Sequence, residues 1–407
     1  MISSENLFSK NKVKEQFSKD TQMKIVCIAA SYVPSNTANS IQVLKATDAL
    51  ASLGNNVTLL VPGDKSAEWV DLKAHYGLQQ SFEIRWLPEH LSFRRYDFAL
   101  KAVREAVRMK PDLVYTWMLQ SAVLSLWRGL PVILELHDRV TGRLGPWLFE
   151  QFWRADTKKR LLTNTTALKK ILVKEYGLKD VAEDIFAAPN GVDLERYSDL
   201  LQPEAMRAEL GLPQAFTAGY TGHFYAGRGM ELMLNLAKTL PEINFLWVGG
   251  HPKDIDLWKE RLAEAGVNNV TLTGFVDNAI LPRYQAAADV LLMPYGTSIA
   301  GSSGGDSAEV ASPMKMFEYL AAGRAIISSD LPVIREVLDE TNAVFCPPDD
   351  LVAWKEALTT LMRDPSQREN LSHAARNTAS NYTWRARAEN ALDGFILQSA
   401  GSAGEAQ

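Results

Sequence analysis

A short predicted helix near residue 315 carries two charged side chains at a spacing that suits a nucleotide. Its signals span Ser312–Gly323: Ser312 is a good N-cap, a proline follows at the first helical position, and a glycine suits the left-handed end. Lys315 falls in the first turn, where the helix dipole disfavours a cation by up to about 1 kcal/mol, and a bound anion would reverse that cost. Glu318 follows three residues later on the same face. The pattern fits a nucleoside diphosphate, with phosphates at Lys315 and ribose at Glu318; an ordinary solvated helix is the alternative.

A second cation stands at the start of another predicted helix. Arg228 lies in a glycine-rich turn with Gly222, His223, Gly227 and Gly229, directly before a helix whose apolar stripe begins at the next residue. Turns of this kind expose backbone N–H groups that hold phosphate. The glycines alone are a weak signal. Two cations at helix starts, where the dipole disfavours both, indicate one shared anionic ligand.

A histidine follows a strongly apolar predicted strand. His137 comes directly after Val132–Leu136. In an open α/β sheet, ligands bind at the carboxyl ends of the strands, so His137 is placed to meet a substrate. A structural histidine is the competing interpretation.

Apolar strands alternate with helical segments along the chain, which predicts an α/β protein with parallel sheets. The loop Ser31–Asn39 contains no glycine, so NAD or FAD binding at the first turn is not expected, and Asn39 or Ser40 caps the helix that follows. The pattern restarts near residue 218, which indicates two domains. Strands are predicted at Met23–Ala30, Val57–Val61, Phe82–Leu87, Leu113–Trp117, Val132–Leu136, Leu161–Asn164, Ile185–Ala188, Ala218–Tyr220, Phe245–Val248, Val270–Leu272, Val290–Met293 and Ala325–Ser328.

Length and composition limit the protein class. A chain of 407 residues exceeds one ordinary core, and a net charge of −5 argues against general nucleic-acid binding. Two cysteines provide neither a disulfide framework nor a metal-binding spacing, and the polar start lacks the apolar core of a secretory signal, which favours the cytoplasm. No apolar run reaches the roughly 20 residues of a spanning helix, so any membrane contact is expected to be peripheral.

Basic residues gather in two stretches of the first half. Arg94, Arg95, Arg104 and Arg108 precede an aromatic segment, Trp147–Trp153, that is followed by further lysines and arginines. Solvated helix faces are the simpler interpretation. The alternative is a surface that recruits an anionic or lipid-linked acceptor, possible at the cytoplasmic face of a membrane.

Four stretches in order resemble the retaining glycosyltransferases of the group one or family four type: Ala188–Tyr197, Tyr220–Gly229, Thr273–Val276 with Ala288–Asp289, and Ser312–Gly323. The similarity covers nearly everything from residue 23 to about residue 396. It implies the GT-B architecture, with two facing Rossmann-like domains, parallel sheets and a donor cleft between them. The expected division is a disordered lead (1–22), an acceptor domain (23–200), a nucleotide-sugar domain (201–382), a terminal helix that crosses back (383–398) and a flexible tail (399–407).

The resemblance also implies roles for individual residues. By position, Arg228 matches the basic residue that contacts the diphosphate, Glu318 matches the glutamate that holds the ribose, and His137 lies where the family places a group near the transferring sugar. The donor would be a UDP- or GDP-linked sugar, the acceptor a glycan, a lipid-linked molecule or a small molecule, and no metal or other cofactor is expected. The nucleotide site is expected to comprise Gly222, His223, Arg228, Phe275, Val276, Ser312, Met314, Lys315 and Glu318, and the catalytic groups His137, Arg228, Lys315 and Glu309.

The sequence departs from the family pattern at two positions. His223 stands where many members carry an arginine for the diphosphate. The first glutamate of the family should stand eight residues before Glu318, where this chain has Val310, and the nearest carboxylate is Glu309. Either a one-residue shift of the loop lets Glu309 take the role of this first glutamate, or the sugar hydroxyls are bound by other groups.

Three other interpretations stay open at this stage. A nucleotide-sugar epimerase shares the fold and the donor site. A non-catalytic scaffold could retain the nucleotide pocket, and the missing glutamate favours it. The pair Asp254 and Asp256 resembles a metal-holding pair, but its place at a helix start favours simple capping.

Overall fold

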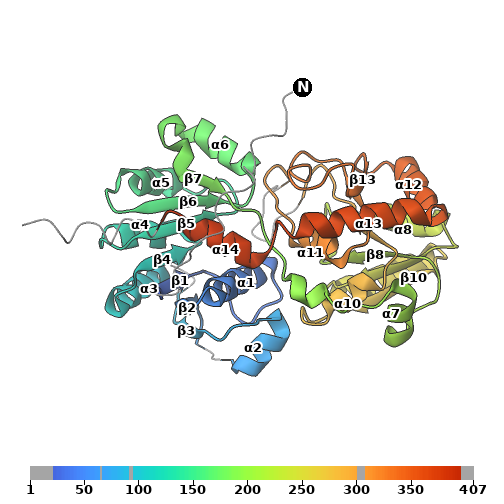
Figure 1. Ribbon diagram of the computed structural model, residues 1–407, viewed down its shortest axis with the longest axis horizontal. Helices are drawn as coiled ribbons and strands as arrows, with labels where there is room; N and C mark the ends of the chain where they lie inside the picture. Colours follow the sequence, from blue (N-terminus) through green and yellow to red (C-terminus); the bar gives the residue numbers. More distant parts are fainter. Residues whose placement is uncertain (1–21, 65–66, 91–94, 300–307, 396–407) are drawn as a thin grey trace, which may run out of the picture.

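Two parallel sheets form the framework of the protein, with strand orders β3-β2-β1-β4-β5-β6-β7 and β10-β9-β8-β11-β12-β13 (Figure 1). The computed structural model describes residues 22–64, 67–90, 95–299 and 308–395. The strands are β1 (Lys24–Ile28), β2 (Asn56–Pro62), β3 (Glu83–Leu87), β4 (Leu113–Thr116), β5 (Val132–Leu136), β6 (Lys159–Thr163), β7 (Ile185–Ala187), β8 (Thr217–Thr221), β9 (Asn244–Val248), β10 (Val270–Gly274), β11 (Val290–Met293), β12 (Ala325–Ser329) and β13 (Ala343–Cys346). The predicted α/β class with two parallel sheets is confirmed.

Helices connect the strands. They are α1 (Ala38–Ser52), α2 (Trp69–Tyr76), α3 (Tyr96–Met109), α4 (Leu119–Leu126), α5 (Gly145–Arg154), α6 (Thr166–Tyr176), α7 (Pro203–Leu210), α8 (Met230–Thr239), α9 (Pro252–Glu264), α10 (Leu281–Ala286), α11 (Met314–Ala322), α12 (Leu351–Arg363), α13 (Pro365–Ala379) and α14 (Trp384–Leu392), with short 3₁₀ helices at η2 (Lys179–Asp184) and η3 (Leu194–Tyr197). Because helices cover both faces of each sheet, strands such as β11 are buried along their whole length.

Two predicted helix starts were wrong. Helix α1 is capped by Thr37, whose hydroxyl accepts from the N–H of Ser40, and not by Asn39 or Ser40. Helix α11 starts after Pro313, and no side chain caps it. Ser312 instead contacts Asn190 of the domain junction: its carbonyl accepts from Asn190 Nδ2 at 2.7 Å. Local capping preference at this position yields to a contact with a distant segment.

The chain crosses between the domains twice, and the two crossings lie side by side. Val192 pairs with Thr383 in a parallel bridge, and its N–H donates to the carbonyl of Tyr382 at 2.9 Å. A Cβ on Gly191 would lie 2.7 Å from the backbone nitrogen of Trp384, so only glycine allows this approach. Asp193 then pairs with the buried Lys45 of α1 at 2.6 Å. The turn-rich junction motif therefore anchors both crossings to the first domain.

The last helix packs on the first domain. Trp384, Ala388 and Leu392 of α14 belong to the same buried cluster as β1 and α1, and Figure 1 shows α14 beside α1. Arg160 of β6 donates to the carbonyl of Ala391 at 2.7 Å. The end of the described chain is thus part of the N-terminal domain. The predicted lead, apart from residue 22, and the predicted tail lie outside the described residues.

Candidate functional site

The glycine-rich turn after β8 is pressed against the loop that follows β11. A Cβ on Gly227 would lie 2.1 Å from the carbonyl oxygen of Ser298, and one on Gly229 would lie 2.0 Å from that of Pro294. Both glycines have positive φ, so the turn needs them for space and for conformation. Between them, the guanidinium carbon of Arg228 lies 4.9 Å from the centre of the Tyr295 ring. The turn therefore holds Arg228 in one place.

The backbone of this turn is less available than the sequence indicated. The N–H of Gly222 donates to the carbonyl of Val248 at 2.9 Å, and the N–H of Arg228 donates to that of Tyr225 at 3.2 Å. These two N–H groups are satisfied inside the protein and are not free for a phosphate. The positive charge of the side chain, and not these N–H groups, is what the turn offers to an anion.

Lys315 extends from the first turn of α11 toward the same place. Its Nζ lies 3.7 Å from the centre of the Tyr220 ring and 5.6 Å from that of Tyr295. A Cβ on Gly222 would come within 2.9 Å of that Nζ. Burial and the nearby Arg228 guanidinium lower the pKa of Lys315 well below its usual value. The two predicted cations thus share one aromatic-lined site, and no carboxylate of the described residues forms an ion pair with either.

Glu318 lies one turn further along α11. Its Oε2 accepts from Gln285 Nε2 at 2.9 Å, and Gln285 Oε1 in turn accepts from the hydroxyl of Tyr197 at 2.8 Å. Glu318 also lines a small cavity at the domain junction, together with Met314, Lys45 and residues of the junction motif. The neutral amide of Gln285 therefore orients a carboxylate that lines the cavity.

Phe275 and Val276 follow β10, at the edge of the second domain. The Phe275 ring is 45% exposed and stacks on His75 of α2, with ring centres 5.8 Å apart. The N–H of Asn278 donates to the carbonyl of His75 at 3.3 Å. The loop expected at the nucleobase therefore touches the first domain.

His223 does not act as a fixed cation in place of arginine. Its Nε2 hydrogen-bonds the carbonyl of Asn36 in the first domain at 3.2 Å, and its ring stacks on Tyr225 and His251. Burial, and then the neighbouring His251, lower the pKa of His223. The ring bridges the domains, and Arg228 and Lys315 provide the positive charge.

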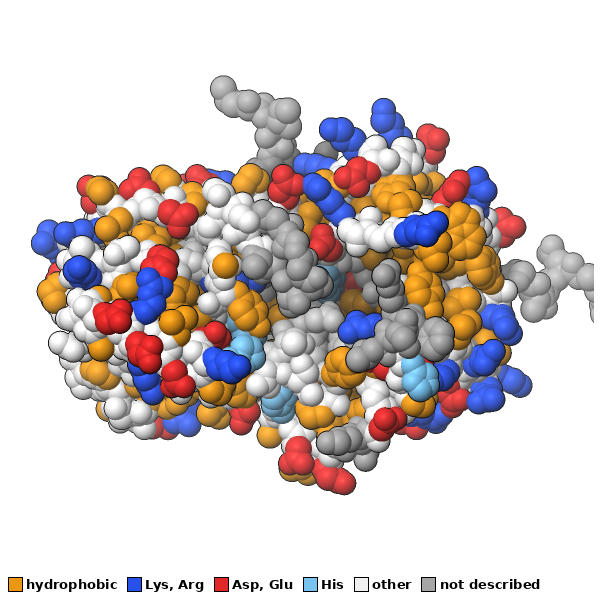
Figure 2. Space-filling view, turned by 180° about the vertical axis from the view of Figure 1, so that it is seen from behind, with side chains coloured by type: hydrophobic (Ala, Val, Ile, Leu, Met, Phe, Trp, Pro, Cys, Tyr) orange, Lys and Arg blue, Asp and Glu red, His pale blue; other side chains and the backbone are white. Residues whose placement is uncertain are grey.

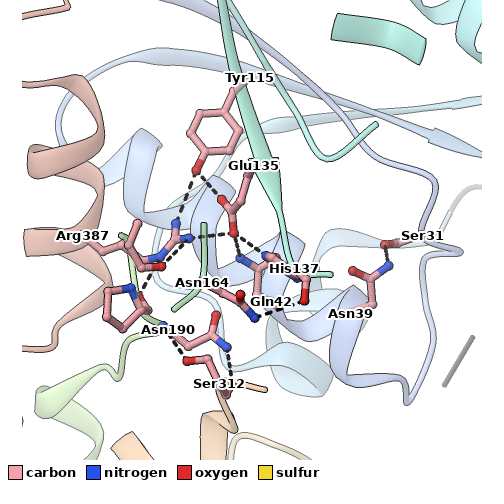
Figure 3. Close-up of polar contacts among 12 residues, drawn as sticks. Ser31, Asn39, Gln42, Tyr115, Glu135, His137, Asn164, Asn190, Ser312 and Arg387 are labelled. Atoms are coloured by element: carbon pink, nitrogen blue, oxygen red, sulfur yellow. Dashed lines mark hydrogen bonds and ion pairs between the residues drawn. The ribbon is translucent and has the colours of Figure 1, made fainter. Parts of the chain in front are cut away.

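His137 belongs to a buried polar network that the sequence analysis missed (Figure 3). Its Nε2 lies 2.5 Å from Oε1 of Glu135, a carboxylate with a fully buried side chain. The same oxygen accepts from Arg387 Nη2 at 2.6 Å and from Gln42 Nε2 at 2.7 Å, and the other oxygen accepts from the hydroxyl of Tyr115. A single carboxylate in the otherwise apolar strand Val132–Leu136 was the available signal.

Val310 and Glu309, the two positions considered for the first glutamate of the family, lie in different surroundings. Val310 is 2% exposed and packs into the core of the first domain, so its side chain is part of the contact between the domains. Glu309 is exposed, and its Oε2 accepts from Arg139 Nη2 of the first domain at 2.5 Å. The structure brings Arg228, Lys315 and Gly222 together directly, while Glu309 is tied to Arg139.

The aromatic segment near α5 is mostly interior. Phe149 and Phe152 are fully buried, so their rings are not available to an acceptor. Trp147 is 48% exposed and contacts Trp127, which is 53% exposed, with ring centres 6.2 Å apart. Arg104 and Arg108 lie on the exposed face of α3, and Arg94 lies outside the described residues. Figure 2 shows hydrophobic and basic side chains together at the end of the N-terminal domain farthest from the other domain.

Asp254, the first residue of the acidic pair after β9, caps a helix. Asp254 Oδ2 accepts from the N–H of His251 at 3.0 Å, at the start of α9. In the described part of the chain, no three His, Cys, Asp or Glu side chains form a group suited to a metal ion. Over the same residues, no helix has both the length and the apolar content to cross a bilayer.

Two family models match the sequence, one in each domain. The model described as Glycosyltransferase Family 4 covers residues 40–196, and the model described as Glycosyl transferases group 1 covers residues 215–364. The first match contains His137, and the second contains Arg228, Lys315 and Glu318.

Individual relatives are distant. The sulfoquinovosyl transferase SQD2 of Arabidopsis thaliana is 23% identical over 308 residues, which are 70% of this chain and 56% of that protein. A phosphatidyl-myo-inositol mannosyltransferase of Mycobacterium leprae is 23% identical over 377 residues, 88% of this chain and 92% of that protein. In the plant protein and two bacterial relatives, the match spans 40 to 62% of the relative's length.

Solved structures share the architecture. The crystal structure of Anabaena HepE in complex with UDP-glucose matches 91% of this chain and 98% of that chain, with a TM-score of 0.68 and 15% identity. At this identity the likeness shows the fold alone.

Proposed function

Because the chain belongs to the group 1 and family four glycosyltransferases and has their GT-B fold of two facing Rossmann-like domains, we propose that it transfers a sugar from a nucleotide-diphosphate sugar to an acceptor hydroxyl with retention of configuration. The observation that carries the proposal is the pair of cations at two helix starts. Arg228 and Lys315 lie over tyrosine rings, with no carboxylate of the described residues paired to them. A diphosphate provides the missing counter-charge.

The leaving group sets the chemistry. As the bond to the sugar breaks, negative charge grows on the nucleoside diphosphate, and Arg228, Lys315 and the first turn of α11 would stabilise it. These groups would supply counter-charge to the leaving group, so we propose that transfer needs no metal ion. EDTA should leave the rate unchanged, and a loss that Mg²⁺ or Mn²⁺ restores would contradict this.

The other groups orient the donor and the acceptor. Glu318 would accept hydrogen bonds from the ribose hydroxyls, and the backbone at Phe275 and Val276 would contact the base, uracil or guanine. The acceptor would approach from the first domain, beside His137, on the face from which the diphosphate leaves. Retention follows from that approach, and the anomeric coupling constant of the product measures it.

Nucleotide preference is the first experiment. A thermal-shift screen with UDP, GDP and their sugars should find one base that stabilises the protein, because a ligand at a hundred times its dissociation constant adds about 2.7 kcal/mol. Incubation with the matching sugar nucleotides should then release nucleoside diphosphate in proportion to the acceptor added. Epimerised donor would instead support an epimerase, and binding without either product would support a scaffold.

For the acceptor, we propose a lipid-linked or otherwise anionic molecule, reached at the cytoplasmic face of a membrane. Exposed Trp127 and Trp147, near a helix that presents Arg104 and Arg108, support a peripheral contact. Each basic residue near an anionic leaflet adds roughly 1 kcal/mol, so attachment should weaken with salt. Co-sedimentation with anionic and neutral liposomes tests this; no binding to anionic vesicles at low salt, with activity on a soluble uncharged acceptor, would contradict it.

A further inference from the structure

The network around Glu135 joins four distant segments at one buried carboxylate. Gln42 comes from α1, Tyr115 from β4, Arg387 from α14, and His137 follows Glu135 at the end of β5 (Figure 3). The side chains of Glu135 and Arg387 are 0% and 6% exposed, whereas that of His137 is 28% exposed. His137 is therefore the point at which this buried charge pair reaches solvent.

The carboxylate is charged and fully occupied. Burial alone would raise the pKa of Glu135, but the Arg387 guanidinium and the hydrogen bond from His137 outweigh it and hold that pKa below its usual range. An ionised carboxylate only accepts hydrogen bonds, so Nε2 of His137 must carry its proton. The other ring nitrogen, Nδ1, makes no hydrogen bond to any residue that the structure describes. In the neutral ring, Nδ1 is an acceptor.

His137 lies beside the domain contact. Its carbonyl accepts from Asn164 Nδ2 at 3.5 Å, and the next hydroxyl along that loop, of Thr165, donates to the carbonyl of Val310 in the second domain at 3.4 Å. Arg139, two residues after His137, pairs with Glu309 of the second domain. The loop that carries His137 therefore lies at the domain contact, where both substrates would meet under the proposed function.

We propose that Glu135 and Arg387 are positioning residues that hold His137 in the Nε2–H tautomer, with Nδ1 as the acceptor for a sugar hydroxyl. The inference rests on the proposed function. Glu135 fixes the tautomer and the ring orientation, as a carboxylate partner of a histidine does. Arg387 cancels the charge of Glu135, so that the ring is not forced into the doubly protonated form. The last helix of the chain is in this way part of the transfer site.

Other ionisable groups around the network stay in one state near neutral pH. Cys27 of β1 lies near Glu135, and burial raises its pKa to about 12. Burial also raises the pKa of Tyr115 well above its usual value. The remaining charged groups are Arg387, on α14, and the exposed Asp138 and Arg139 that follow His137.

The test is ¹⁵N NMR of the full chain labelled in its six histidines, with the His137 signals identified from a His137→Gln variant. In the parent protein, the neutral ring of His137 should be the Nε2–H tautomer alone. Glu135→Gln leaves Arg387 without a counter-charge, so the titration midpoint should fall by about one pH unit and both tautomers should appear. Arg387→Met leaves Glu135 without one, so the midpoint should rise by a similar amount.

Arg160→Met is the matched control. Arg160 also ties α14 and the residues after it to the first domain, through the carbonyl of Ala391 and the ring of Phe395, and no hydrogen bond joins it to Glu135 among the described residues. Its substitution should leave the tautomer and the midpoint unchanged. Unchanged His137 signals in Glu135→Gln, or equal shifts in Arg160→Met, would overturn the proposal; if Arg387→Met does not fold, Glu135→Gln decides alone.

The kinetic readout separates this inference from the proposed function. With UDP-glucose and GDP-mannose as probes, the acidic limb of the pH–rate profile should move down in Glu135→Gln and up in Arg387→Met, and not in Arg160→Met. The NMR result needs no donor. The expected tautomer in a protein that transfers no sugar would contradict the proposed function alone, and active variants with unmoved limbs would contradict the positioning role alone.

Discussion

The two halves of the site hold their charges in opposite ways. In the second domain, Arg228 and Lys315 lie over tyrosine rings, and no carboxylate of the described residues pairs with them. In the first domain, Glu135 has four donors, among them the guanidinium of Arg387. Charge is left unsatisfied at one place and fully satisfied at the other.

The contrast separates binding from support. Two neighbouring cations without a counter-ion cost stability, and a bound anion recovers that cost, so such a pair indicates a ligand. A saturated buried ion pair has nothing left to offer a ligand. What it provides is a fixed geometry for the group at its edge, here His137.

The largest expected effect is on stability, from removal of the buried cation of the first domain. Arg387→Met leaves Glu135 buried and unpaired, and should lower the free energy of unfolding by about 3–5 kcal/mol in urea at pH 7. Because Arg387 holds the pKa of Glu135 below its usual range, the contribution of the pair is complete above about pH 5 and is lost as the pH falls below the ordinary carboxyl range. The control Arg160→Met should cost clearly less, and an equal loss in both variants would argue against an ion-pair effect.

The next effect is on turnover, from removal of the unpaired cations. Arg228→Ala should lower kcat by about 100-fold or more, because loss of one donor to a developing anion typically has that effect. Lys315→Ala should lower it less, since a guanidinium holds two phosphate oxygens at once. Arg261→Ala is a control: Arg261 also stacks on a ring, that of Trp258, but it pairs with Glu231. The opposite order of the first two variants would assign the leaving group to α11.

A smaller effect concerns nucleotide affinity. Glu318→Ala should weaken binding of the preferred nucleotide by about tenfold, since hydrogen bonds to a charged group contribute about 1.5–3 kcal/mol. Calorimetric titration measures it. Glu318→Gln separates the effect of the charge from that of the side-chain size, because it removes the charge and keeps the size of the side chain that contacts Gln285. Unchanged affinity in Glu318→Ala would remove the carboxylate from the site.

The smallest effect completes the comparison. Lys315→Met keeps a long side chain over Tyr220 and removes a charge that burial and Arg228 disfavour, so stability at pH 7 should stay the same or rise by up to about 1 kcal/mol. Folding lowers the pKa of Lys315, so the folded parent protein loses this proton at a lower pH than the unfolded chain does. The stability that Lys315 costs the parent protein, relative to Lys315→Met, should therefore shrink as the pH rises toward about 10. Unfolding curves at pH 7 and 9.5 measure this. A clear loss of stability at pH 7 would mean that Lys315 has a structural role.

Local patterns were sufficient for most of the strands and for the two cations. Predicted strands coincide with β5 and β11 at both ends, because apolar runs of this length between helices fit a sheet that is covered on both faces. Gly323 ends α11 in the left-handed conformation, as expected. Arg228 and Lys315 could be identified as candidate phosphate contacts because the helix dipole disfavours a cation at a helix start, and a helix start can be recognised from a few neighbouring residues.

Long-range contacts decided the rest. Glu135 and Arg387 are separated by 252 residues, and nothing local to either residue identifies the other as its partner. Ser312 has the residue type of a helix cap, yet it contacts Asn190, and Val310 enters the core of the other domain. Sequence alone determined where most of the strands and the unusual cations lie, since these depend on neighbours along the chain. Only the tertiary structure decided which charges are paired, because pairing depends on the side chains that packing brings together.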